Sequence, residues 1–488
     1  MNRILLVTML LLPFLGGGVL AALSRKEKRA IDAAFLTVLG LEAAAVTWYL
    51  FLPDAALPLF SMTDALTVRL STDGVGRLFL AVGAYGFLLS GVYAVRYMAH
   101  SGRQATFYAW MLFSLGALVG MDESDNLITM YLFFECATLL SMPLVLHDRT
   151  PESIRAALKY LFYSIAGAFL ALLATFTVAS FSDSLSFTAG GVLNSSTSEH
   201  RTLLEIVVLL GVVGFGAKAG LYPLHGWLPT AHPVAPAPAS AVLSAIIAKA
   251  GVLAIVRLVF YIVGADFLRG TWVQYVLLSL ALLTVFMGSM MAFREDLFKK
   301  RLAYSSVSQI SYVLVGLFTL TESGVAGGLL HVAAHASIKI CLFLVAGSFI
   351  VNLEKTRVSE LAGVGKAMPV TLFSFTIAAL GLIGIPPASG FVSKWYLALG
   401  ALDSGLSVLN WLVPVILLVS ALLTAGYLLP ITIRGFFPGK DFPAVRRTDE
   451  GTAVMWAPIA LLAAVSLLLG VFGGPLTDWL LSIAKALV

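Results

Sequence analysis

The hydrophobic pattern of the chain is a series of long apolar runs separated by short polar segments. About fourteen runs approach or exceed the roughly 20 residues with which a helix crosses a bilayer. Of the 488 residues, 59% are hydrophobic and 12% are charged, which excludes a water-soluble fold. The sequence therefore predicts an all-α polytopic membrane protein with about 14 transmembrane helices. We expect them at 2–22, 31–52, 74–97, 105–121, 127–146, 155–181, 203–220, 237–262, 271–292, 302–320, 323–351, 369–400, 409–434 and 454–472.

The first run resembles a secretory signal, because Arg3 precedes it and the small residues Ala21 and Ala22 close it. Cleavage there would leave the basic cluster 25–29 on the outer side, against the tendency of Lys and Arg to stay inside. We therefore expect a retained first span. With an outer N-terminus, 20 Lys and Arg fall on the inner side and 6 on the outer side. Both termini should then face outward, with the tail 475–488 on the surface.

The stretch from Gly214 to Gly251 combines apolar runs with glycine, five prolines and two lone lysines, Lys218 and Lys249. Proline removes a backbone donor and glycine weakens a helix, so the chain around Pro223 should be a broken helix. Pro386 and Pro387 predict a second break inside the run 369–400. Broken backbone at membrane depth is tolerated only inside protein or beside a water-filled cavity. Both breaks therefore indicate an ion pathway.

The two breaks also suggest an internal repeat. Each lies near a lysine, and the small motifs Ala250-Gly251 and Ala425-Gly426 follow at the same interval of about 175 residues. Two units of five spans would be inverted relative to each other, as in many transporters. We expect an N-terminal three-helix segment at 1–104, repeats at 105–262 and 271–434, and a C-terminal helix and tail at 435–488.

Glu135 and Lys218 are lone charges in separate apolar runs. Each is costly to bury unpaired, so we expect the two groups within ion-pair reach, directly or through one water. Separating such a pair would leave a lysine in a poorly solvated site, where it gives up its proton more readily. A movable pair of this kind would act as a proton switch. A carboxyl that is only hydrogen-bonded within the bundle remains the alternative.

Lys249 lies too far from either end of its run to reach the membrane surface, which favours a proton relay site. His331, His335 and Lys339 recur every four residues and therefore share one helix face. The two histidines lack an accompanying acidic or cysteine ligand, so we expect no metal site there. A polar stripe that carries protons between lysines is the functional interpretation, and hydrogen-bonded core histidines are the structural one.

Lys394 follows the second break, and the expected span 302–320 offers it no acidic partner. We expect it near water, the His331–Lys339 face or an acid of an adjacent subunit, as an exit for protons. The alternative is a lysine at a helix end that reaches the surface. Asp122, Glu123 and Asp125 precede the Glu135 run, where they would collect cations at an outer mouth or form a solvated turn.

Four stretches together resemble the proton-translocating antiporter-like subunits: the Glu135 run, the segment from Lys218 to Gly251, HVAAHASIKICLFL and GIPPASGFVSKW. That family includes subunits of respiratory complex I, Mrp-type cation/proton antiporters and membrane-bound energy-converting hydrogenases. The resemblance covers nearly the whole chain. Some members have glutamate at the position of Lys394, and others have a long lateral helix, for which the tail 475–488 is too short.

The resemblance implies fourteen helices in inverted five-helix repeats, with the seventh and twelfth helices broken. It implies that Glu135 and Lys218 form the coupling pair, that Lys249 is the central relay and that Lys394 is the terminal lysine. It also implies a prokaryotic-type inner membrane, lipid and other membrane subunits as partners, including homologous antiporter-like ones, and protons with or without Na+ as cargo.

Three functions compete at this stage: a proton- or cation-translocating subunit of a larger complex, a self-sufficient secondary transporter, and a redox-complex subunit without its own transport. The sequence contains no CxxC motif, Walker loop or dinucleotide-binding glycine pattern, so we expect no cofactor, no metal and no catalytic residue in this chain. The net charge of +5 reports topology rather than nucleic-acid binding. We favour the translocating subunit.

Overall fold

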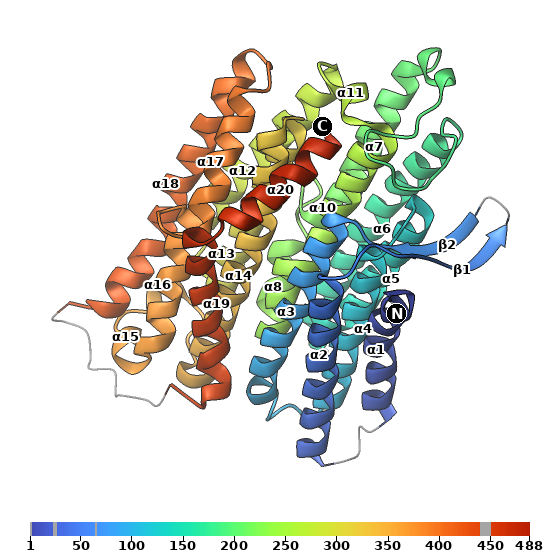
Figure 1. Cartoon of the computed structure of the whole chain (residues 1–488). Coiled ribbons are helices and arrows are strands. Elements are labelled where there is room, and N and C mark those ends of the chain that lie inside the picture. The colour runs from blue at the N-terminus through green and yellow to red at the C-terminus, as the bar shows by residue number, and fades with distance from the viewer. Residues whose placement is uncertain (1, 23–26, 64–65, 440–449) are drawn as a thin grey trace.

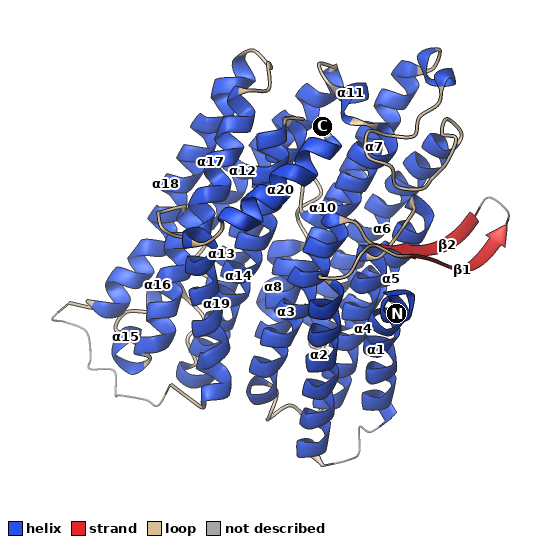
Figure 2. Cartoon of the chain, viewed as in Figure 1, coloured by secondary structure: helices blue, strands red, loops and turns tan. Residues whose placement is uncertain are grey.

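The structure is a computed structural model that describes residues 2–22, 27–63, 66–439 and 450–488. Long helices run roughly side by side through the molecule, and one short hairpin projects from it (Figures 1 and 2). Every expected span coincides with a helix or a broken helix, and the ends agree within four residues. This agreement follows from bilayer thickness, which sets the length of an apolar helix before tertiary contacts act.

The N-terminal segment contains α1 (Asn2–Ala22), α2 (Lys28–Tyr49), β1 (Ala56–Thr63), β2 (Leu66–Ser71) and α3 (Gly74–Tyr97). The two strands pair antiparallel, with Ala56 opposite Ser71. The sequence analysis missed this hairpin, because its strands are short and their apolar residues were too few to register as a span. The fold class is otherwise as expected.

The next segment contains α4 (Gln104–Asp122), α5 (Leu127–Val145), α6 (Pro151–Ala179), the turn η1 (Ser195–Ser198), α7 (Arg201–Ala219) and α8 (Leu228–Val234). One continuous helical stretch follows, formed by α9 (Ala237–Val242), η2 (Leu243–Ile247), α10 (Lys249–Val256) and η3 (Arg257–Val263). The segments η2 and η3 are π-helical. Such widened turns are rare and often mark functional positions in helices.

The second half begins with α11 (Ala265–Leu268), α12 (Trp272–Arg294), α13 (Phe298–Phe318) and α14 (Glu322–Leu353). It continues with η4 (Val358–Glu360), α15 (Val364–Ala367), α16 (Pro369–Ile383), α17 (Ser389–Leu402) and α18 (Val408–Phe436). The chain closes with α19 (Ala453–Val471) and α20 (Gly474–Leu487). The helix α14 is central, because α3, α9, α13, α16, α17, α19 and α20 all pack against it.

Both expected breaks are confirmed. The helix α7 ends at Gly220, which adopts a left-handed φ of 82°, and α8 begins eight residues later at Leu228. The indole of Trp227 donates to the carbonyl of Ala217 at 2.9 Å, which satisfies one of the carbonyls that the break exposes. The second break separates α16 from α17, again after a left-handed glycine, Gly384.

The bundle has two ends, which we name for their contents. The hairpin face comprises β1–β2 and the segments 122–126, 180–200 and 264–271, and the basic face comprises the segments 97–103, 146–150, 294–297 and 354–368. Asn2 donates to the carbonyl of Pro53, and Ile483 lies against Gly74 at the start of α3. Both termini therefore lie at the hairpin face, as an even number of spans requires.

By length and composition, 12 helices of the described chain can cross a membrane, and α16 is a shorter apolar helix. The helix α13 falls short of that criterion because its first turn is basic and its length is rich in serine. The count of fourteen spans and the inverted repeat remain predictions. On the outer sides of α6 and α18, Phe162 and Leu418 are exposed, as lipid-facing residues should be.

The tail forms α20, which packs on α14 and α3 through Leu480, Ala484 and Leu487 and leaves its other side exposed. In Figure 1 it runs obliquely across the bundle. The expectation that the tail lies on the surface is correct for one side of this helix. The other side is part of the core.

The second break depends on a close backbone approach at Gly390. A Cβ there would lie 1.9 Å from the carbonyl oxygen of Gly381. We expect Gly390→Ala to lower the free energy of unfolding by about 1–3 kcal/mol, since backbone atoms would have to move apart. Gly18→Ala is the matched control, because a Cβ on that exposed helix meets no atom within 4 Å. Thermal unfolding in detergent measures both, and equal stability of the two variants would contradict the packing argument.

Candidate functional site

Glu135 and Lys218 lie on the neighbouring helices α5 and α7. The Lys218 ammonium donates to the Thr138 hydroxyl at 2.5 Å and lies 5.1 Å from the ring centre of Phe134. Thr138 is one turn after Glu135, so the lysine reaches the same side of α5 as the carboxylate. Hydroxyl and ring together partly replace the solvation that a buried ammonium loses.

The two charged groups form no direct ion pair in this structure. Oε1 of Glu135 is buried without a hydrogen-bond partner, while the residue as a whole is half-buried. The direct form of the expected contact is therefore wrong for this conformation, and the water-bridged form stays a prediction. The reason is local: the Thr138 hydroxyl, one turn along α5, takes the lysine.

Lys249 begins α10, immediately after the π-helical turn η2, and is 1% exposed. Its ammonium donates to the carbonyl of Ala245 in its own helix at 2.6 Å. No carboxylate within the described chain forms an ion pair with it. The site is deep inside the bundle.

His331, His335 and Lys339 do share one face of α14, and that face is turned toward α13. The ring nitrogens of His331 lie 2.8 Å from the Ser393 hydroxyl and 3.1 Å from Oε1 of Gln309. Lys339 donates to the carbonyl of Leu302 at 2.9 Å and to the Ser305 hydroxyl. The stripe is thus built from side chains of α13, α14 and α17.

His335 lies between these two residues along the stripe. Its ring is 5.9 Å from that of His331, and neither of its nitrogens has a hydrogen-bond partner among the residues that the structure describes. The side-chain nitrogen of Gln309 is also buried and unpartnered. Buried polar groups of this kind bond to ordered water. The stripe can therefore hold water between its protonatable groups.

Lys394 lies on α17 just after the second break and turns back toward α16. Its ammonium donates to the carbonyls of Leu382 and Ile383 at 2.6 and 2.8 Å, where the end of α16 presents negative partial charge. It also lies 4.9 Å from the ring centre of Tyr312, and that ring stacks on His331 at 5.5 Å. No acid of the described chain pairs with Lys394, and its role as a proton exit stays a prediction.

The structure corrects the interpretation of Asp122, Glu123 and Asp125 as a solvated turn. Asp122 ends α4 and is 5% exposed, while Glu123 caps that helix and is fully buried. Asp125 pairs with Arg69 of the hairpin at 3.1 Å. Burial raises the pKa of Glu123 well above its usual range, and the neighbouring carboxyls of Glu42 and Asp122 raise it further.

A buried ion pair at the hairpin face escaped the sequence analysis. Arg257, counted there among outer-loop residues, is 2% exposed and binds both oxygens of Asp73 at 2.6 and 2.8 Å. Burial alone would raise the pKa of Asp73, but the guanidinium lowers it to about 2. A lone arginine at the end of an apolar run was the available signal. Its partner lies 184 residues away and could not be assigned.

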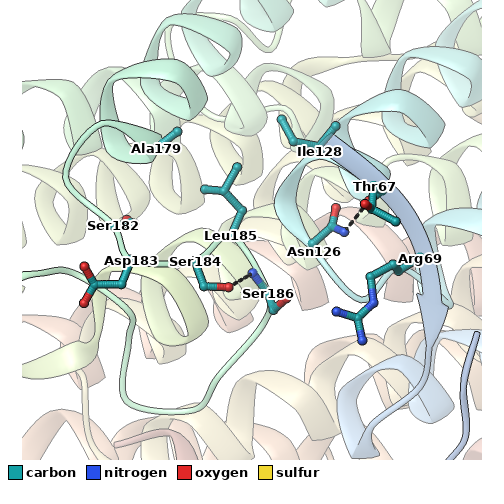
Figure 3. A pocket seen from close by; sticks show the side chains of 10 residues that line it. All are labelled: Thr67, Arg69, Asn126, Ile128, Ala179, Ser182, Asp183, Ser184, Leu185 and Ser186. Atoms are coloured by element: carbon teal, nitrogen blue, oxygen red, sulfur yellow. Dashed lines mark hydrogen bonds between the residues drawn. The ribbon is translucent and has the colours of Figure 1, made fainter. Parts of the chain in front are cut away.

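The hairpin face also carries two cavities. One, of about 420 Å³, is lined by Thr67 and Arg69 of β2, Asn126, and the segment 182–186 (Figure 3). The other, of about 180 Å³, is lined by Asp73, Asp125 and Arg257 among others. The Arg69–Asp125 ion pair joins the linings of the two cavities. Among the residues that the structure describes, no three His, Cys, Asp or Glu side chains are grouped to hold a metal ion.

Comparison with known proteins places this arrangement in a family. The family described as NADH:quinone oxidoreductase/Mrp antiporter, transmembrane, matches residues 124–437. NADH-quinone oxidoreductase subunit N of Desulforudis audaxviator is 34% identical over 412 residues, which cover 81% of this chain and 80% of that protein. A Na(+)/H(+) antiporter protein of Alkalihalophilus pseudofirmus is 28% identical over 382 residues, which cover 78% of this chain and 76% of that protein.

A solved structure of the Mrp complex from Dietzia sp. DQ12-45-1b contains a chain with the same fold. It superposes with a TM-score of 0.86 and 23% identity, covering 99% of this chain and 97% of that one. At this identity the likeness concerns the fold. Together with the sequence relatives, it confirms the resemblance found in the sequence. The chain belongs to the transmembrane family of NADH:quinone oxidoreductase and Mrp antiporter subunits.

Proposed function

We propose that this chain is a proton-translocating subunit of a multi-subunit, energy-converting membrane complex. The observation that carries the proposal is the row of buried basic groups Lys218, Lys249, His335, His331 and Lys394, with Lys339 beside it. None of them has a carboxylate partner in the described chain, and two of them adjoin broken helices. Intramembrane ionisable groups are costly and are retained where protons or ions move.

The coupling step uses Glu135 and Lys218. When the carboxylate approaches, the ammonium form of Lys218 is favoured, and when it withdraws, Lys218 passes its proton inward. The helix α7 ends at the break and does not continue directly into α8. Lys218, near this end, can therefore make small movements relative to α5. The half-buried position of Glu135 supports its exposure to a neighbouring subunit.

The remaining groups act in series. Lys249 receives the proton, the stripe His335, Lys339 and His331 carries it, and Lys394 hands it on at the second break. Hydrogen-bonded side chains and waters conduct protons over such distances by exchange along the chain of bonds. The stack of Lys394 on Tyr312 and of Tyr312 on His331 supports this final connection.

For orientation, we propose that the basic face is cytoplasmic in a prokaryotic-type inner membrane, with both termini outside. A cavity of about 410 Å³ at the basic face is lined by His147, Asp148 and Lys299. Lys299 donates to the carbonyls of Pro233 and Ala235, and His232 is buried nearby with both ring nitrogens unpartnered. This cavity is the proposed inlet.

The partners are other membrane subunits, among them homologous antiporter-like chains, and the surrounding lipid. Protons are the proposed cargo. Transport that requires Na+ would identify an exchange of Na+ for H+. We expect the purified chain alone to be inactive, because Glu135 depends on its neighbours to move.

The proposal is tested by replacing Glu135 with Gln in the assembled complex. The change keeps the shape and removes the charge that controls Lys218, so proton translocation should fall on the order of 10²-fold. A pH-sensitive dye in sealed vesicles measures it, with the amount of assembled complex determined in parallel. Glu152→Gln, at an exposed ion pair with Arg155, is the matched control. Full translocation in the Glu135→Gln complex would refute the coupling role.

A further inference from the structure

A small cavity joins Asp122 and Lys249. It lies between α3, α4 and α10, and apolar side chains such as Val82, Leu118 and Ile246 complete its wall. Its volume of about 10 Å³ is close to the space of a single water. Asp122 and Lys249 are the ionisable groups of the wall, one from each side.

Neither group forms an ion pair with another residue that the structure describes. Asp122 also makes no side-chain hydrogen bond to a described residue, although only 5% of it is exposed. Within the described chain, the Lys249 ammonium has one hydrogen bond, to a carbonyl of its own helix. A carboxylate and an ammonium are each expensive to bury alone, so one water that bridges them would stabilise both.

The backbone of Asp122 lies next to the ion pair of the hairpin face. Arg257 follows Lys249 by eight residues in the same helical stretch. The Arg257 guanidinium and the backbone carbonyl of Asp122 both lie against Gly76 of α3. A Cβ at Gly76 would be 3.4 Å from the guanidinium and 2.5 Å from the carbonyl oxygen. Beyond Arg257 and Asp73 lies the cavity of about 180 Å³ that Asp125 also lines.

We propose that Asp122 is the proton-transfer residue between Lys249 and the cavity at the hairpin face, with the Arg257–Asp73 pair closing the outer end. This inference rests on the proposed function. The Lys249 ammonium gives a proton to the bridging water, which gives one to the Asp122 carboxylate, leaving a neutral amine and a neutral acid. The Asp122 acid then releases its proton to water of the outer cavity. The relay therefore has a branch that leaves the membrane through α3 and α4.

The next acid along the chain is unsuited to this role. Both oxygens of Glu123 are buried without a hydrogen-bond partner among the described residues, but Glu123 does not line the cavity beside Lys249. Asp122 is the acid that lines this cavity. Gly76 of α3 allows Asp122 to approach, because a Cβ there would lie 2.5 Å from the Asp122 carbonyl oxygen.

The test compares Asp122→Asn and Asp122→Glu in the assembled complex, with proton translocation measured in sealed vesicles. We expect Asp122→Asn to lower the rate on the order of 10²-fold, and Asp122→Glu to restore most of it because an acid is again present. Asp266→Asn, at an exposed ion pair of the same face, is the matched control. A normal rate in Asp122→Asn, or an equal loss in Asp122→Glu and Asp122→Asn, would overturn the proposal.

A second variant leaves every charge in place. Ala250→Val fills the cavity that holds the bridging water, and it should also slow translocation at least about tenfold. Ala44→Val, the same change at an exposed position of α2, should not. If the Asp122→Asn complex fails to assemble, the comparison of Ala250→Val with Ala44→Val tests the proposal instead. A normal translocation rate in Ala250→Val overturns it. A Lys249→Ala complex that still translocates would instead refute the proposed function itself, so the two failures are distinguishable.

Discussion

Replacing Lys249 by alanine is expected to abolish proton translocation while the complex still assembles. Among the described residues, the ammonium's one hydrogen bond is to a carbonyl of its own helix, so its removal breaks no hydrogen bond between helices. The loss should be on the order of 10² to 10⁴-fold, the range for removing a positioned proton donor. Sealed vesicles with a pH-sensitive dye measure the rate, and native electrophoresis measures assembly.

Lys249→Arg separates charge from proton transfer. Arginine keeps the positive charge but does not release a proton in proteins, so this complex should be as inactive as the alanine variant. Lys485→Ala, on the exposed side of α20, controls for the loss of one lysine. Near-normal translocation by an assembled Lys249→Ala complex would remove the central relay from the mechanism.

Lys394 should be essential for translocation because it carries a proton, and not because it binds the end of α16. Its ammonium both carries a proton and caps the last carbonyls of α16. Lys394→Gln keeps an N–H donor for those carbonyls but carries no proton, whereas Lys394→Leu loses both functions. We expect both variants to lose translocation on the order of 10²-fold. Only the leucine variant should also lower the unfolding temperature, through about 1–3 kcal/mol of unsatisfied carbonyls.

The measurement is therefore a pair: translocation rate in vesicles and thermal unfolding of the detergent-purified complex. Full activity of Lys394→Gln would show that the residue only anchors the break. Lys366→Gln, an exposed lysine outside the long helices, serves as the control for both readouts.

Much of this site could be anticipated because membrane burial makes charge conspicuous. Glu135, Lys218, Lys249 and Lys394 are lone charges in apolar runs, and each lies within a helix or a broken helix as expected. His331, His335 and Lys339 share a face because a helix brings every fourth residue to one side. Local spacing and the cost of burial were sufficient for these assignments.

The contacts between helices were less predictable. Opposite charge favoured a Glu135–Lys218 pair, direct or through one water, yet Lys218 binds Thr138, a residue that no charge argument would select. Asp122 was expected in the outer loop before the Glu135 run, either at a cation-collecting mouth or in a solvated turn. The packing of α4 against α3 instead buries it beside Lys249.

Local features of the sequence set where the helices lie and where two of them break. Bilayer thickness sets the length of each helix, and proline and glycine set the breaks. Both effects act over a few turns of one helix. Tertiary packing sets which groups meet: Lys218 with Thr138, Arg257 with Asp73, and Lys394 with the end of α16. These contacts join distant parts of the chain, and the angles and depths at which helices pack fix them to within one hydrogen-bond length.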